Sequence, residues 1–289
     1  MANRRVLVKR RKAIQNIRKI TRTMQLIATA RFQAAFGRAT ASKPYVARLT
    51  ELVAELSRGE GQVAHPLLSV PAPEAPTALL VLTSNRGLCG GYNSNVLRTA
   101  VAAFEERAAA GTAPELHVFG KKGAAYFRFQ RRPMTSQHID LGDAPRFEEV
   151  EPVAAEMMAR FLAGELSAVE VVHMRFHSAG LQQPELFQLL PLQPVESGAP
   201  QASPVEYELR PDARALLDEL LPASVRIRLF QAFQDAAISE QSARMVAMKA
   251  ATDAAEEMIR TLTRQYNRAR QTHITMELLD IIGGANALA

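Results

Sequence analysis

Apolar residues at both ends of the 289-residue chain recur every three or four positions, which is typical of helices that pack along one side against a partner helix. Near the N-terminus this repeat comprises Val6, Arg10, Ala13, Ile17, Ile20, Met24 and Ile27. Near the C-terminus it comprises Met245, Met248, Thr252, Ala255, Ile259, Leu262, Tyr266, Ala269, His273 and Met276. Two such segments pair most simply with each other, so the pattern predicts a long antiparallel coiled coil.

Glycine and proline mark where these helices end, because neither suits a helix interior. Both are absent from residues 1–36; Gly37 and Pro44 then interrupt, and helical composition continues to about Ser57. Both are also absent from residues 223–282, enough for a helix of roughly 90 Å at about 1.5 Å per residue. We expect an N-terminal coiled-coil helix at 1–58, a proline-rich linker at 59–76 and the C-terminal coiled-coil helix at 211–289.

Between the terminal helices the pattern changes to short strands that alternate with helices, which is typical of an α/β domain. The expected strands are 77–83, 115–119, one around His138, 168–176, 185–192 and an edge strand at 205–209, with a turn near Gly180. The expected helices are 93–110, 123–129 and 147–162. The predicted fold class is therefore α/β: a central Rossmann-like domain at 77–210, plus the antiparallel coiled coil of both termini.

Charge is distributed unevenly along the chain. The formal net charge is +6, but thirteen lysines and arginines precede Glu51, the first acidic residue. A basic helix of this kind is compatible with a targeting segment, with nucleic acid, with an acidic protein partner or with a plain solvated helix. A matched helical repeat at the far end of the chain argues against a removable targeting segment, and no nucleic-acid-binding module is evident. No apolar stretch approaches the roughly 18 residues of a membrane span, so a soluble or peripheral protein is expected.

Motifs for catalysis are not evident. The pair Gly120 and Lys121 lacks the rest of a phosphate-binding loop, and Gly87, Gly90 and Gly91 have the wrong spacing for dinucleotide binding. We interpret these three glycines as a tight strand-to-helix turn. His173 and His177 are poorly spaced to share a metal, and Cys89, the only cysteine, is expected to be a small buried residue. We predict no catalytic residue, metal or cofactor.

Three separated segments resemble the gamma subunit of the rotary F-type ATP synthase. They are IQNIRKITRTMQLIATARF at residues 14–32, TSNRGLCGGYN at 83–93, and SEQSARMVAMKAATDAAEEM with YNRARQTHITMELLDIIGGA at 239–258 and 266–285. Their order and spacing cover essentially the whole chain. Asn85 departs from the family pattern by replacing an acid, and Met276 stands where glutamine is common.

The resemblance implies a central rotor stalk without an active site of its own. Its partners would be the alpha and beta subunits as a hexamer, the epsilon subunit and the c-ring, with no nucleic acid. Proton or sodium flow would turn ring and stalk together, transmitting torque for ATP synthesis or hydrolysis. The protein would be peripheral to the cytoplasmic face of the bacterial inner membrane. A basic coiled-coil adaptor or nucleic-acid-binding protein is the alternative function.

The resemblance also implies partner-contact residues. Lys19, Arg22 and Met24 would contact the lever loop of the beta subunits. Arg270, Gln271 and Thr275 would engage the beta subunit's catch loop, and Tyr207 would lie near the c-ring.

Overall fold

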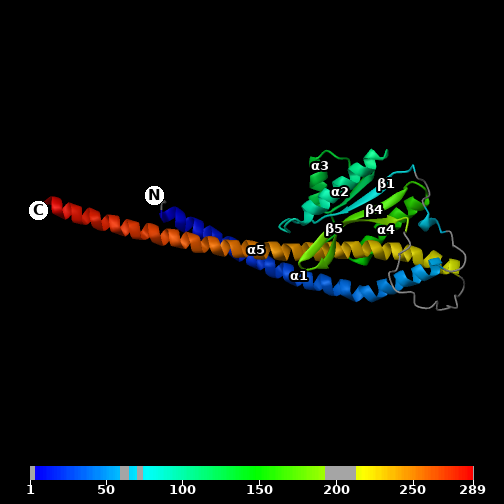
Figure 1. Cartoon of the computed structure of the whole chain (residues 1–289), viewed down its shortest axis with the longest axis horizontal. Helices are drawn as coiled ribbons and strands as arrows, with labels where there is room; N and C mark the ends of the chain where they lie inside the picture. The colour runs from blue at the N-terminus through cyan, green and yellow to red at the C-terminus, as the bar shows by residue number, and fades with distance from the viewer. Residues whose placement is uncertain (1–3, 59–64, 70–73, 193–212, 289) are drawn as a thin grey trace. The chain divides into compact units, whose positions relative to one another are not determined.

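The computed structural model describes residues 4–58, 65–69, 74–192 and 213–288 (Figure 1). Within these ranges the chain forms two compact units. One contains the N-terminal part of helix α1 (Arg4–Arg58), up to Ala30, and the part of helix α5 (Ala213–Leu288) that begins at Arg244. The other contains residues 31–243. No helix in the described part of the chain is both long and apolar enough to cross a membrane.

The first unit is an antiparallel pair of helical segments. Thr252 of α5 donates a hydrogen bond to the hydroxyl of Thr21 in α1 at 2.8 Å, and the guanidinium of Arg11 lies 5.3 Å from the ring centre of Tyr266. The earlier residue of α1 thus meets the later residue of α5, which requires opposite helix directions. This arrangement confirms the predicted coiled coil of the two termini.

The predicted packing face of the N-terminal helix is wrong by one position. Leu7, Thr21 and Ala28 are buried, whereas Ile17 and Ile20 are 47% and 60% exposed. The buried positions belong to a repeat of Leu7, Arg11, Ile14, Arg18, Thr21, Gln25 and Ala28, all buried or half-buried. Small side chains and the aliphatic stems of arginines can line a close helix contact while charged ends reach water. A prediction from apolar spacing alone therefore assigned the helix contact to the outward face, because that face is richer in isoleucine.

The C-terminal repeat is confirmed over most of its length. Met248, Thr252, Ala255 and Leu262 are buried, and the intervening members of the repeat up to Ala269 are half-buried. The prediction fails only at its last two positions, His273 and Met276, which are exposed. These positions lie beyond the turn that packs opposite the start of α1.

Both terminal helices continue through a proline, and the N-terminal one has no interruption at Gly37 and Pro44, where we expected one. Helix α1 runs through Gly37 and Pro44, and α5 begins before Pro222 and continues through it. An internal proline removes one backbone hydrogen bond, but burial of neighbouring side chains can offset this cost. Around Pro222 that burial is complete, because Leu217, Leu221 and Val225 are fully inaccessible to solvent.

The second unit contains a five-stranded sheet in the order β3-β2-β1-β4-β5. Its strands are β1 (Thr77–Leu82), β2 (Glu115–Phe119), β3 (Ser136–His138), β4 (Ala168–Ser178) and β5 (Leu181–Leu190). Strands β3, β2, β1 and β4 are mutually parallel, and β5 runs antiparallel to β4 after a turn at residues 179–180. The α/β domain is thus confirmed, with β5 starting four residues before the predicted 185–192; the edge strand predicted at 205–209 lies outside the described residues.

Helices cover both faces of this sheet. They are α2 (Tyr92–Ala109), α3 (Lys121–Phe129) and α4 (Phe147–Leu162), with a 3-10 turn at Pro66–Leu68. Alternate residues of β1 divide between two cores: Leu80 and Leu82 pack with α4 and α5, whereas Leu79 and Val81 pack with α2 and α3. The sheet is therefore buried on both sides, which explains the continuous apolar sequence of β1.

Candidate partner-binding surface

Positive charge dominates the paired helices of the first unit. Residues 4–30 contain nine lysines and arginines and no acid, and residues 244–288 contain six basic and five acidic groups. The unit therefore has a formal charge of +10, whereas the whole chain has +6. Such a surface attracts an acidic partner and accelerates its association.

Apolar side chains are exposed on the same surface. We call Ile17, Ile20 and Ile27 the outer stripe; these residues of α1 are 47%, 60% and 50% exposed. They recur at helical spacing, so they lie along one side of the helix. Exposed apolar side chains gathered in this way mark sites of protein association. The outer stripe and its surrounding cations thus form a surface suited to a partner that is both acidic and apolar.

The residues predicted to contact a lever loop lie beside the outer stripe. Lys19 and Arg22 are exposed and Met24 is half-buried. Arg22 donates a hydrogen bond to the side chain of Gln25 at 3.2 Å, and neither cation forms an ion pair within the described part of the chain. Their charges are therefore available to an external acid.

The residues predicted to engage a catch loop lie near the end of α5. Arg270, Gln271 and Thr275 are all exposed, and Thr275 donates its hydroxyl to the carbonyl of Gln271 at 3.0 Å. Every residue from 270 to 283 is exposed, including Leu279 and Ile281 at 61% and 68%. A long helical end that exposes large apolar groups is a second candidate contact region, and sequence analysis missed its apolar part because it treated Met276 as buried.

The two predicted contact groups are separate. Thr21, close to Lys19 and Arg22, meets Thr252, which is eighteen residues before Arg270 in α5. At about 1.5 Å per residue this corresponds to roughly 27 Å along the helix. The two groups therefore belong to different contacts with any partner. Tyr207 lies outside the described residues.

The glycine turn lies between β1 and α2. Gly90 has a φ of 57°, a conformation that favours glycine, and Gly91 precedes the first residue of α2. A side chain at Gly87 would meet only Lys122 at ordinary contact distance. Asn93 holds the turn, because its amide oxygen accepts from the backbone of Ser84 at 3.0 Å and its amide nitrogen donates to Cys89, which is buried as expected. These contacts fix backbone and thiol without exposing a reactive group.

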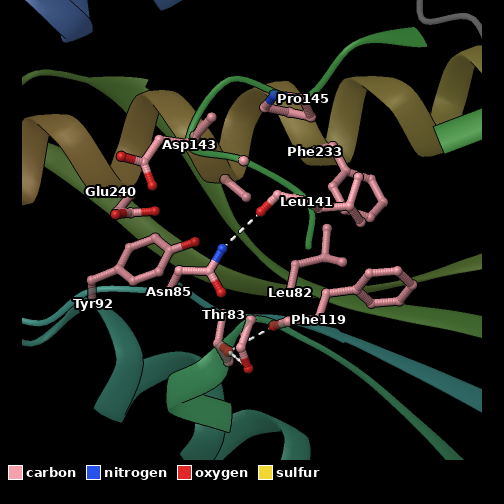
Figure 2. A pocket seen from close by; sticks show the side chains of 14 residues that line it. Leu82, Thr83, Asn85, Tyr92, Phe119, Leu141, Asp143, Pro145, Phe233 and Glu240 are labelled. Atoms are coloured by element: carbon pink, nitrogen blue, oxygen red, sulfur yellow. Dashed lines mark hydrogen bonds between the residues drawn. The ribbon is translucent and has the colours of Figure 1, made fainter. Parts of the chain in front are cut away.

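A small cavity lies beside this turn (Figure 2). Asn85 at its edge donates to the carbonyl of Leu141 at 2.7 Å and accepts from the backbone of Lys121 at 3.0 Å. An ionised acid at this position could not donate a hydrogen bond to the carbonyl of Leu141, which explains structurally why asparagine replaces the acid here. The cavity volume of about 50 Å³ suits a few water molecules. It is far too small for a nucleotide.

The most constrained glycine is Gly120, whose sequence context indicates only an incomplete phosphate-binding motif. Its φ is 94°, and a side chain there would overlap the carbonyl of Thr83. Thr83 also donates its hydroxyl to the carbonyl of Phe119 at 2.7 Å. Gly120 therefore allows the end of β1 to pack closely against the start of α3.

Among the described residues no group of three or more potential metal ligands is present.

Fold and surface together define an α/β protein with a coiled coil of its two termini that exposes a basic, partly apolar surface. A family profile described as ATP synthase matches residues 3–288. The chain is 42% identical to the ATP synthase gamma chain of Rhodopirellula baltica, covering 100% of this chain and 99% of the relative. It is 39% identical to the ATP synthase gamma chain of Leptospira biflexa, covering 100% of both. The chain therefore belongs to the ATP synthase gamma-chain family, the central-stalk subunits of the rotary F-type enzyme.

Solved structures show the same fold. A chain of the Euglena gracilis mitochondrial ATP synthase, described as OSCP/F1/c-ring, superposes with a TM-score of 0.68 at 18% identity, covering 99% of this chain and 94% of that one. A chain of the Tetrahymena thermophila mitochondrial ATP synthase, described as central stalk/c-ring, gives 0.57 at 20% identity, covering 80% and 99%. Full-length family membership disfavours the alternative of a nucleic-acid binder or free-standing adaptor.

Proposed function

We propose that the paired terminal helices turn inside a hexamer of alpha and beta subunits and that the α/β domain connects them to a c-ring. Gamma-chain relatives match along the whole chain, and solved neighbours belong to F1 and c-ring assemblies. The observation that supports this proposal best is the combination of a +10 charge and exposed isoleucines on the helix pair. Such a rotor transmits torque and selects among partner conformations, while the partners perform catalysis.

The contacts with the beta subunits follow from the placement of the two exposed groups. Lys19 and Arg22 would pair with an acidic lever loop, with Met24 and the outer stripe contributing apolar contact. Arg270, Gln271 and Thr275 would form hydrogen bonds with a catch loop about 27 Å away along α5. With two contacts separated along the helices, the hexamer would hold the stalk at two points, so that torque is transmitted between them; a single contact would not provide this.

The remaining partners and the location belong to the same proposal. The epsilon subunit would bind the α/β domain, and Tyr207 would face the c-ring. Through that ring the protein would be peripheral to the cytoplasmic face of the bacterial inner membrane. The domain limits at 58, 76 and 210 are also proposed, with the linker and the region before α5 joining helices to the domain.

A reconstituted alpha–beta–gamma complex tests the catch contact. Arg270→Ala combined with Gln271→Ala should lower the ATP hydrolysis rate several-fold, because each exposed side chain would lose a polar contact with the hexamer. The matched control is Arg98→Ala, an exposed arginine on α2 in the other unit. Circular dichroism should show unchanged folding in both variants. Hydrolysis equal to the control would refute the assigned contact.

A further inference from the structure

A large cavity lies within the second unit. Its volume is about 400 Å³, within the range of small-molecule sites, whereas the cavity beside Asn85 is about eight times smaller. Its walls come from α1, β4, β5 and α5. The residues used below are His173, Arg175, Phe176, Phe187 and Arg228, with Phe36 on α1.

Arg228 is an unpaired cation in this wall. Within the part of the chain that the structure describes, its guanidinium has neither an ion pair nor a hydrogen bond. Burial also lowers the pKa of Arg228, because desolvation disfavours the charged form. Arg226, two residues earlier on α5, instead pairs with Glu151 at 3.6 Å. A partly desolvated guanidinium without a partner is costly unless a ligand or water occupies its donors.

His173 presents a second unsatisfied group. The residue is only 4% exposed, and its Nδ1 is buried without a hydrogen-bond partner among the described residues. Burial first, and then the charge of Arg175, lowers the pKa of His173 to about 4, so the ring is neutral at pH 7. Its edge-on packing against Phe187, with ring centres 5.3 Å apart, holds the ring in place. Neutral imidazole can offer Nδ1–H to an oxygen atom.

The other charged groups of the cavity are already engaged. Arg175 donates to Glu185 at 2.9 Å, and Asp235 has an interaction of its own. Arg228 and His173, together with the amide of Gln231, are therefore the polar groups of the lining that remain for a ligand. Around them Phe36, Phe176 and Phe187 provide aromatic surface, with Phe36 and Phe176 packed edge to face at 6.0 Å.

We propose that this cavity binds a small organic anion whose phosphate or carboxylate group contacts Arg228 and His173 Nδ1, while its apolar part packs against the three phenylalanines. A guanidinium binds either oxyanion through two parallel hydrogen bonds. An inorganic anion alone would leave the aromatic walls and most of the volume to water. The inference goes beyond the rotor function, because the site lies in the α/β unit and uses none of the residues assigned to the beta subunits.

Titration of the purified full-length chain tests the site, with phenyl phosphate and benzoate as probes and inorganic phosphate for comparison. Calorimetry should show saturable binding of at least one aromatic probe, with inorganic phosphate at least about tenfold weaker because it lacks the apolar part. The stronger aromatic probe identifies the preferred oxyanion. In carbon–proton NMR spectra of the histidine rings, the His173 signal is assigned as the one that is absent from the His173→Gln variant. This signal should shift when the aromatic probe is titrated into the wild-type chain.

The variant Arg228→Gln should weaken binding by at least about tenfold, the usual effect of losing a charged hydrogen bond. Arg226→Gln, the matched control outside the cavity lining, should change affinity less than about twofold. Absence of saturable binding, or equal affinity in Arg228→Gln, would overturn the proposal and indicate a cavity filled by water. If Arg228→Gln fails to fold, the NMR titration of the wild-type chain tests the proposal instead. Probe binding that leaves the His173 signal unshifted would then overturn the proposed site.

Discussion

Thr252 of α5 and Thr21 of α1 share a hydrogen bond of 2.8 Å between buried hydroxyls. Thr21 in turn donates to the carbonyl of Arg18 at 3.1 Å, and the carbonyl of Met248 lies 2.8 Å from the Thr252 hydroxyl, so both hydroxyls have partners within the helix pair. Polar groups within a coiled-coil contact favour one register, because any other register leaves them unpaired. The two threonines thus fix how α1 and α5 align in the first unit.

Replacement of one threonine by valine should destabilise the chain by about 1 kcal/mol, because one buried hydroxyl loses a partner. Thr21→Val and Thr252→Val combined should cost less than the sum of the single changes, since two apolar groups of the same shape can pack together. Urea denaturation of the four proteins measures this double-mutant cycle. Strict additivity would show that the hydroxyls do not interact.

Arg107 and Glu170 form an ion pair between α2 and β4, with donor and acceptor 2.5 Å apart; the Glu170 side chain is only 7% exposed, whereas that of Arg107 is 33% exposed. This hydrogen bond raises the pKa of Arg107. Arg107→Ala should cost about 3 kcal/mol, because it strands a buried carboxylate. Adding Glu170→Gln should recover part of that loss. Glu106→Ala, on the exposed neighbour, is the control and should change the free energy of unfolding by less than about 0.5 kcal/mol.

Acid should destabilise the α/β unit through His173. The pKa of this histidine is about 4 in the folded chain, where burial lowers it from its ordinary value of 6.5, so between these two pH values the unfolded chain binds a proton that the folded chain does not. Folding stability from this group is therefore complete above pH 6.5 and falls as the pH drops towards 4, by up to about 3 kcal/mol. His173→Phe should flatten the pH dependence of the free energy of unfolding across this window. The exposed His177 provides the control, and a profile unchanged in His173→Phe would contradict the assignment.

Gly120→Ala should destabilise the chain by more than about 2 kcal/mol, because the added carbon would overlap Thr83 and the residue has a φ of 94°. Gly111 has a φ of 117° but open space around it, so Gly111→Ala isolates the cost of conformation, about 1 kcal/mol. Thermal unfolding of both variants separates overlap from conformation. Equal losses would mean that the backbone near Thr83 moves aside at little cost.

Much of the fold follows from local sequence patterns. Strand β2 and helix α4 have the predicted limits, because each combines a clear apolar period with turn residues on both sides. The interruption expected at Gly37 and Pro44 is absent from α1, since local propensity does not include the tertiary contacts that support a helix through proline. The outward position of Ile20 was also missed, because a partner can require an apolar side chain that the isolated chain leaves exposed.

The candidate surfaces follow from sequence only in part. Lys19, Arg22 and the end of α5 are recognisable through charge and family resemblance, and the structure adds that they are exposed. The cavity of Arg228 and His173 had no sequence signal. Its walls come from α1, β4, β5 and α5, and only tertiary packing shows that His173 Nδ1 and Arg228 lack partners among the described residues.

Rotation of this chain within its hexamer tests the central claim most directly. A bead can be attached through Arg98→Cys, an exposed position on α2, because the only native cysteine, Cys89, is buried. With the alpha–beta hexamer fixed to a surface and ATP supplied, the bead should rotate in one direction and pause at three angles. Replacement of Ile17, Ile20 and Ile27 by aspartate should reduce torque or stop rotation. ATP hydrolysis without bead rotation by the otherwise unaltered chain would contradict its role as the central rotor.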